Sequence, residues 1–393
     1  MKLFPDSFVK YYSSTIGNRN IVDTTLTLPL VIQTIFGQQI LDPNWWSKGT
    51  ILKHIFHLVL HIYAIIGTIV FMEDATDTTL KAEACFTIII TVMLFMKYSL
   101  YINNRSSFQK AYLIAKTTVF DIIKESSYKK SSEFLNKIKI IIKLLLVTVS
   151  CPVVAYILAN FWNCAHGVKT TLSKTTSILM PMRTPYYEIG LILHIAFMFG
   201  ISFTLIVIDM WFVILTFFFC EASDALGDLL TVKQRKEEPN NEYATRLNDT
   251  LKQFYVQHVK LMEYLNILSN MYKWPTLIPL LNVLLIFCLI LFLVSEEIKL
   301  TFLSNLLPGL VECFAYNWFG EQLQTKATSL KMALMQFDWS NMNVKDMKNY
   351  LIIVGYTKKD ISLKTAVGND LSMSTMSVLK ASYQAFAVLK SNN

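Results

Sequence analysis

The amino-acid sequence predicts an all-α integral membrane protein with seven transmembrane helices. Of its 393 residues, 53% are hydrophobic and 16% are charged, whereas an ordinary soluble domain has about 25% charged residues. Several apolar runs reach about 20 residues, which is the length that a helix needs to cross a bilayer. Long connections rich in Lys and Arg alternate with shorter connections that are poor in them, as expected when alternate loops lie in the cytoplasm.

The predicted spans differ in how clearly they are apolar. The first, third, fourth and fifth spans contain no Lys, Arg or Glu. Their one acidic residue is Asp209, which divides the fourth span into two runs. The second, sixth and seventh each carry a charge in or beside the run, so they are the weaker predictions. In chain order the spans are residues 54–72, 82–101, 144–163, 189–208 with its continuation 210–220, 274–294, 300–320 and 371–389.

The distribution of Lys and Arg predicts the orientation of the chain. The N-terminal segment and the connections 102–137, 221–272 and 321–368 together carry 24 of the 36 Lys and Arg residues, and the segments on the opposite side carry 6. Because cytoplasmic loops hold the excess of positive charge, we expect the N-terminus in the cytoplasm and the C-terminus outside. This orientation disfavours a G-protein-coupled receptor, a class whose N-terminus lies outside the cell.

Two of the cytoplasmic connections have helical periodicity of their own. In residues 243–268 and 322–335, apolar residues recur at intervals of three and four with charged residues between them. We expect these helices to extend the spans and to pack together below the membrane. The predicted organisation is therefore a six-helix bundle at 1–320 with its extensions 102–137 and 221–272, anchor helices at 321–368 and the last transmembrane helix at 369–393.

Histidines on the first span are the main candidate for metal chemistry. His54, His57 and His61 share one face of that helix, and three imidazoles in one place can bind a transition metal. A membrane enzyme built on these residues is one alternative function. We favour a polar stripe that faces either another helix or the inner interface of the membrane, with no cofactor, no metal and no enzymatic activity, because the sequence contains 6 His in all and the other three lie on different elements.

Polar residues inside the spans are candidates for function, because they are costly in a bilayer. Asp209 in the fourth span and Glu312 in the sixth are the clearest, and each could pair with a neighbouring helix. Lys380 lies midway along the last span, where its side chain can extend to the interface. One face of that span is small and polar, which suits close helix packing and a water-filled pore equally well. The residues of this face are Ser374, Ser377, Ala381, Gln384 and Val388.

The C-terminal part of the chain resembles the insect odorant receptor family. The resemblance rests on residues 316–323 (YNWFGEQL), on Asp338-Trp339 and on residues 378–383 (VLKASY). It covers roughly the last 80 residues, and the remainder agrees in size, number of spans, orientation and long inner loops. The departures from the family's pattern concern details of gating, and they lie at Met335, Asp360 and Gln384-Ala385.

The resemblance implies a ligand-gated, non-selective cation channel in the plasma membrane of an olfactory neuron dendrite. Such receptors assemble with a shared co-receptor as a heterotetramer, and each subunit contributes its last span to a central pore. The short connection 221–272 implies an odorant-tuned subunit, because the co-receptor has a longer loop there. The last-span motif places the hydrophobic gate at Val388. A gustatory-type receptor channel of the same fold is the alternative.

The resemblance also implies a ligand pocket in the outer half of the bundle, between the second, third, fourth and sixth spans. The residues at that depth are aromatic and aliphatic with few polar groups. Such a lining suits a small, volatile, apolar ligand. The expected lining residues are Phe86, Ile90, Tyr156, Asn160, His194, Phe197 and Met198.

Overall fold

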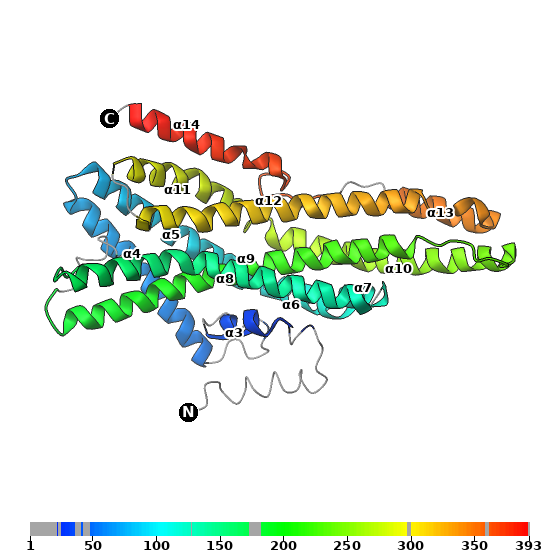
Figure 1. Cartoon of the computed structure of the whole chain (residues 1–393), viewed down its shortest axis with the longest axis horizontal. Coiled ribbons are helices and arrows are strands. Elements are labelled where there is room, and N and C mark those ends of the chain that lie inside the picture. Colours follow the sequence, from blue (N-terminus) through cyan, green and yellow to red (C-terminus); the bar gives the residue numbers. More distant parts are fainter. Residues whose placement is uncertain are drawn as a thin grey trace.

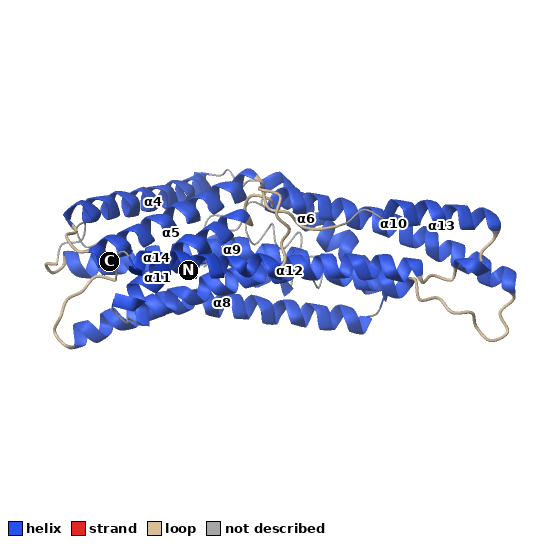
Figure 2. Cartoon of the chain, turned by 90° about the horizontal axis from the view of Figure 1, so that it is seen from above, coloured by secondary structure: helices blue, strands red, loops and turns tan. Residues whose placement is uncertain are grey.

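A computed structural model of the chain shows an elongated bundle of helices that lie roughly along its long axis (Figures 1 and 2). The structure describes residues 22, 25–35, 41, 48–126, 128–172, 182–296, 300–357 and 361–391. Within these residues there is no β-strand, and the only β-type pairing is an isolated bridge between Lys364 and Asp370. The predicted all-α class is confirmed.

The helices that correspond to the predicted spans gather in one half of the molecule (Figure 1). Four stretches of the described residues, in α4, α5, α8 and α9, are long and apolar enough to cross a membrane. The stretch in α9 is mostly buried, whereas those in α4, α5 and α8 expose apolar side chains, as helices facing lipid do. The helices are α4 (Lys48–Asp74), α5 (Thr78–Asn103), α8 (Tyr128–Ala165), α9 (Tyr186–Leu229), α11 (Leu277–Glu296), α12 (Leu300–Met335) and α14 (Ser377–Ser391).

The other half of the molecule contains the helical extensions that the sequence analysis predicted (Figure 1). Here α8, α9 and α12 continue beyond their spans and pack with the remaining helices, so the periodic segment 322–335 is the second part of α12 and no separate helix. One hydrophobic core runs through both halves. The additional helices are α3 (Thr27–Ile35), α6 (Arg105–Ile114), α7 (Phe120–Ser126), α10 (Asn240–Tyr272) and α13 (Val344–Thr357), with a π-helical turn at Ala115–Val119.

Buried aromatic residues hold α9 and α10 together in this lower half. Tyr264 on α10 is completely buried, and its hydroxyl donates a hydrogen bond to the carbonyl of Leu215 at 2.7 Å.

Where α10 begins, the Arg246 guanidinium donates two hydrogen bonds to the Glu238 carboxylate, at 2.9 and 2.6 Å. This bidentate pair lowers the pKa of Glu238 to about 2. The two hydrogen bonds join the connection between α9 and α10 to the first turns of α10.

The last helix begins later than the sequence predicts. We expected a helix from residue 371, but α14 starts at Ser377 after a 3₁₀ turn at Met373–Met376. The preceding residues are fixed by contacts with α12: Leu371 is buried against Gly320, and the Met373 amide donates to the Glu321 carboxylate at 2.8 Å. These contacts hold the chain in a non-helical path, so the predicted start was wrong.

Candidate ligand-binding site

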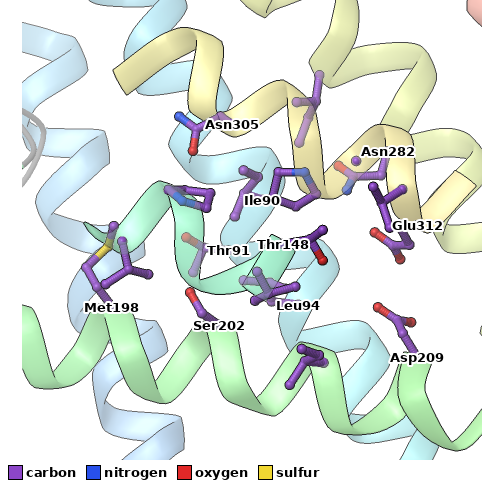
Figure 3. Close-up of a pocket in the computed structure, with 18 of the residues that line it drawn as sticks. Ile90, Thr91, Leu94, Thr148, Met198, Ser202, Asp209, Asn282, Asn305 and Glu312 are labelled. Carbon is purple, nitrogen blue, oxygen red and sulfur yellow. The ribbon is translucent and has the colours of Figure 1, made fainter. Parts of the chain in front are cut away.

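A cavity of about 200 Å³ lies between α5, α8, α9, α11 and α12, and Ala64 of α4 also lines it (Figure 3). It lies in the half of the molecule that holds the helices of the predicted spans (Figure 1). Six of the seven residues that the sequence analysis selected line it: Phe86, Ile90, Tyr156, His194, Phe197 and Met198.

Asn160, the seventh selected residue, is not part of the cavity lining. It lies one turn beyond Tyr156 on α8, where its side-chain amide donates to the carbonyl and the hydroxyl of Thr170 in the following loop. Its side chain is buried by this loop. Asn160 therefore fixes the C-terminal end of α8 to the following loop. The sequence analysis placed it in the cavity lining because the path of this loop has no signature in the sequence.

The walls of the cavity are mainly apolar, and two helical prolines contribute to them. On α5, Phe86, Ile90 and Leu94 lie four residues apart and so share one face. Pro152 lies inside α8 and Pro308 inside α12, and both line the cavity. A proline within a helix removes one backbone hydrogen bond, and sharp bends in helices commonly lie at prolines.

A hydrogen bond crosses the cavity wall between two helices. The Asn305 amide on α12 donates to the Tyr156 hydroxyl on α8 at 3.0 Å. Tyr156 and Asn305 both line the cavity. A ligand that contacts either side chain therefore contacts a partner of the hydrogen bond that joins α8 and α12. His194 is buried in the wall formed by α9.

The end of the cavity nearest the half that holds α10 and α13 is charged, and we call it the cavity floor (Asp209, Asn282, Glu312 and Tyr316). Lys97 on α5 bonds to Asp209 on α9, with 2.8 Å between Nζ and Oδ1, and also to Glu312 on α12. The Tyr316 hydroxyl donates to Asp209 Oδ1 at 2.6 Å. The Lys97 side chain is 2% exposed, so this cluster ties three helices together inside the bundle.

The sequence analysis identified the members of this cluster without joining them. It expected that Asp209 and Glu312 could each pair with a neighbouring helix, and it treated charge in the second span, where Lys97 lies, as a weakness of that prediction. The sequence did contain a signal that could have joined them. One Lys and two acidic residues lie in three different spans, and charged residues inside membranes usually pair with one another. The lining is consequently more polar than expected at this one end.

The histidine stripe on α4 packs against neighbouring helices. His61 hydrogen-bonds through Nδ1 to the His57 carbonyl at 2.7 Å, and its ring contacts Phe95 and Phe197. His54 contacts the Tyr98 hydroxyl on α5. Within the described residues, no group of three or more His, Cys, Asp or Glu side chains is arranged to hold a metal ion. The ring contacts place the stripe against α5 and α9, which is one of the two positions that the sequence analysis expected for it.

The predicted pore residues lie on or just before α14, which packs mainly on α11 (Figure 1). Ser382 is fully buried, and its hydroxyl donates to the Val283 carbonyl of α11 at 3.3 Å. Ala381, Gln384 and Val388 are exposed on the remaining surface of the helix. Ser377 is the first residue of α14, and Ser374 lies in the 3₁₀ turn before it, so Ser374 does not continue the helical face.

A family model described as 7tm Odorant receptor matches residues 78–383, which is well over half of the chain. The chain belongs to this odorant receptor family. As a member of it, the protein is a transmembrane odorant receptor and not an enzyme, and the enzyme interpretation of the histidine stripe is set aside.

Solved structures agree with the receptor fold. The olfactory receptor OR5 from Machilis hrabei matches with a TM-score of 0.70 and 13% identity, over 89% of this chain and 92% of that chain. The structure of OR5 in complex with eugenol matches with the same values. At this identity the similarity establishes the fold alone. No curated protein matches the chain.

Proposed function

We propose that this odorant receptor is a ligand-tuned subunit of a non-selective cation channel in the plasma membrane of olfactory neuron dendrites. A small volatile molecule binds in the cavity, and its binding opens a central pore. The observation that carries the proposal is the largely apolar cavity of about 200 Å³ inside the helix bundle, whose apolar walls with a few polar groups are those of a small-molecule site. The eugenol complex of OR5, a structure of similar fold, lends support to a small aromatic or aliphatic ligand.

The last helix supports the pore assignment. Its buried face bonds to α11 through Ser382, whereas Ala381, Gln384 and Val388 lie on exposed parts of the helix. Val388 is 60% exposed in the single chain. In a heterotetramer with a co-receptor, α14 of each subunit would surround a central pore. A ring that includes Val388 would then close the pore by excluding water.

Two helices connect the cavity to α14. On α11, Asn282 lines the cavity and the adjacent Val283 carbonyl accepts the hydrogen bond from Ser382. On α12, Glu312 lines the cavity, and Glu321 binds the Met373 amide just before α14. A ligand opens the channel only if it binds the open arrangement more tightly than the closed one. Displacement of α11 or α12 by the ligand would move α14 directly.

Alanine at Tyr156 or His194 is expected to change which odorants activate the channel. Loss of a buried aromatic contact is worth about 1.5–3 kcal/mol, so the half-maximal concentration of ligands that touch the residue should rise about 10- to 100-fold. Other ligands should keep their potency, and the rank order should change. Dose–response curves of odorant-evoked current, recorded with a co-receptor present, measure this effect.

The matched control for this experiment is Leu158→Ala. Leu158 lies on the same helix as Tyr156 but is 63% exposed and outside the cavity lining. This variant should leave the rank order unchanged. If the Tyr156 and His194 variants reach the surface and respond to every ligand as the wild type does, these residues do not contact the ligand and the proposed site is wrong.

A further inference from the structure

The cavity floor offers more hydrogen-bond acceptors than donors. Both hydrogen bonds to Asp209 end on Oδ1, and the bond from Lys97 to Glu312 ends on Oε1. No described residue donates to Asp209 Oδ2 or to Glu312 Oε2. The side-chain oxygen of Asn282 is buried and has no hydrogen-bond partner among the described residues. Figure 3 shows the two carboxylates facing each other, with Asn282 beside Glu312.

The charges at the floor are also out of balance. Two carboxylates share a single ammonium, so the cluster retains one negative charge when both are ionised. An uncompensated charge in a water-poor interior is costly, and pairing with an opposite charge removes much of that cost. The other titratable groups in the lining are His194, Tyr156 and Tyr316, and none of these can supply a fixed positive charge at the floor as Lys97 does.

The rest of the cavity has the opposite character. Ile90 and Leu94 line it on the α5 side and Met198 on the α9 side, and Met198 lies at the far end from Asp209 and Glu312 (Figure 3). A ligand that fills this space has a hydrocarbon body at one end and a hydrogen-bond donor at the other. An ammonium group satisfies both requirements of the floor, because it carries a positive charge and up to three N–H donors.

We propose that the cavity selects small amines, with the protonated nitrogen between the free oxygens of Asp209 and Glu312 and the hydrocarbon part against Ile90 and Met198. The bound cation completes a neutral cluster of two carboxylates and two ammonium groups, with Lys97 as the other member. This inference rests on the proposed function and specifies the class of its ligand.

The first test compares matched ligands on the wild-type receptor, expressed with an insect odorant co-receptor. Hexylamine is compared with 1-hexanol, and 2-phenylethylamine with 2-phenylethanol, by current recording. A charge-assisted hydrogen bond is worth more than a neutral one, so each amine should act at a concentration about tenfold or more below that of its alcohol. Alcohols that equal or exceed their amines in potency would overturn the inference.

The second test is Glu312→Gln, which keeps the side-chain shape and leaves a neutral pair of Lys97 and Asp209. The ratio of amine potency to alcohol potency should fall about tenfold, while current evoked by the alcohols shows that the variant is folded. The matched control is Glu263→Gln, which makes the same change in a side chain that is 55% exposed and outside the cavity lining, and it should change the ratio less than about twofold. An unchanged ratio in Glu312→Gln would contradict the inference.

The outcomes separate this inference from the proposed function. Current evoked by alcohols without any preference for amines would refute the amine site and leave the receptor channel intact. No current with any volatile, when surface expression of both subunits is confirmed, would contradict the proposed function and the ligand class with it. If Glu312→Gln fails to reach the surface, the wild-type comparison of matched ligands still decides.

Discussion

Replacing Lys97 with Met is expected to remove the folded receptor from the cell surface. The substitution keeps an unbranched side chain of nearly the same length but leaves Asp209 and Glu312 facing each other without a counter-charge. Their side chains are 13% and 11% exposed, so water cannot screen the repulsion well. Loss of one partner of a buried ion pair costs about 3–5 kcal/mol, which is a large part of the stability of most domains. Surface labelling and thermal denaturation of detergent-solubilised receptor measure this effect.

The control for Lys97 is a lysine in an exposed pair. Lys110 bonds to Glu263 at 2.7 Å, but the two side chains are 57% and 55% exposed. Exposed pairs contribute about 0–1 kcal/mol, so Lys110→Met should fold normally. Combining Lys97→Met with Asp209→Asn and Glu312→Gln should restore part of the surface expression, because the unpaired charges are gone. Normal expression and stability of the single Lys97 variant would show that the cluster does not hold the three helices together.

Replacing Gly320 with Ala is expected to abolish most of the ligand-evoked current. A Cβ at this position would lie 2.4 Å from the Leu371 Cβ and 2.6 Å from the Leu371 carbonyl oxygen. Both distances are shorter than non-bonded atoms can approach. Because the carbonyl oxygen belongs to the backbone, it cannot move away by a side-chain rotation, so α12 and the segment before α14 must move apart. That displacement also strains the bond between Glu321 and the Met373 amide. At matched surface expression, we expect current to fall about tenfold or more.

The control for Gly320 is Gly355 in α13. A Cβ at Gly355 meets no atom within 4 Å, so Gly355→Ala should keep full current. It should also raise the stability slightly, by up to about 1 kcal/mol, because Ala is the better helix former. Full current from the Gly320 variant, with normal surface expression, would mean that the contact between α12 and residue 371 plays no part in gating.

The sequence predicted the helices well because their apolar runs and loop charges follow directly from the bilayer. Periodicity identified α10 and the second part of α12, and the depth of residues along the spans selected six side chains that line the cavity. Periodicity assigns residues to a face, but it does not say which helices are neighbours. For that reason Lys97, Asp209 and Glu312 appeared as separate anomalies, although together they form one cluster at the cavity floor.

Two further misplacements have local causes. The start of the last helix depends on the close approach of Leu371 to Gly320, a tertiary contact that no pattern within residues 371–389 indicates. Asn160 has a depth suited to the pocket, but a hydrogen bond to Thr170 in the following loop holds it outside the cavity. In both places a contact with a distant or irregular segment decides the local structure. Periodicity within a helix does not predict such contacts.

Current recording with an odorant panel is the most direct test of a ligand-gated channel built from this subunit. The receptor is expressed with and without an insect odorant co-receptor, and surface expression is confirmed in both cases. A fast inward cation current in the paired cells alone is the predicted result. Current from this chain by itself would contradict the role of the co-receptor, and silence in both kinds of cell would contradict the proposed channel function.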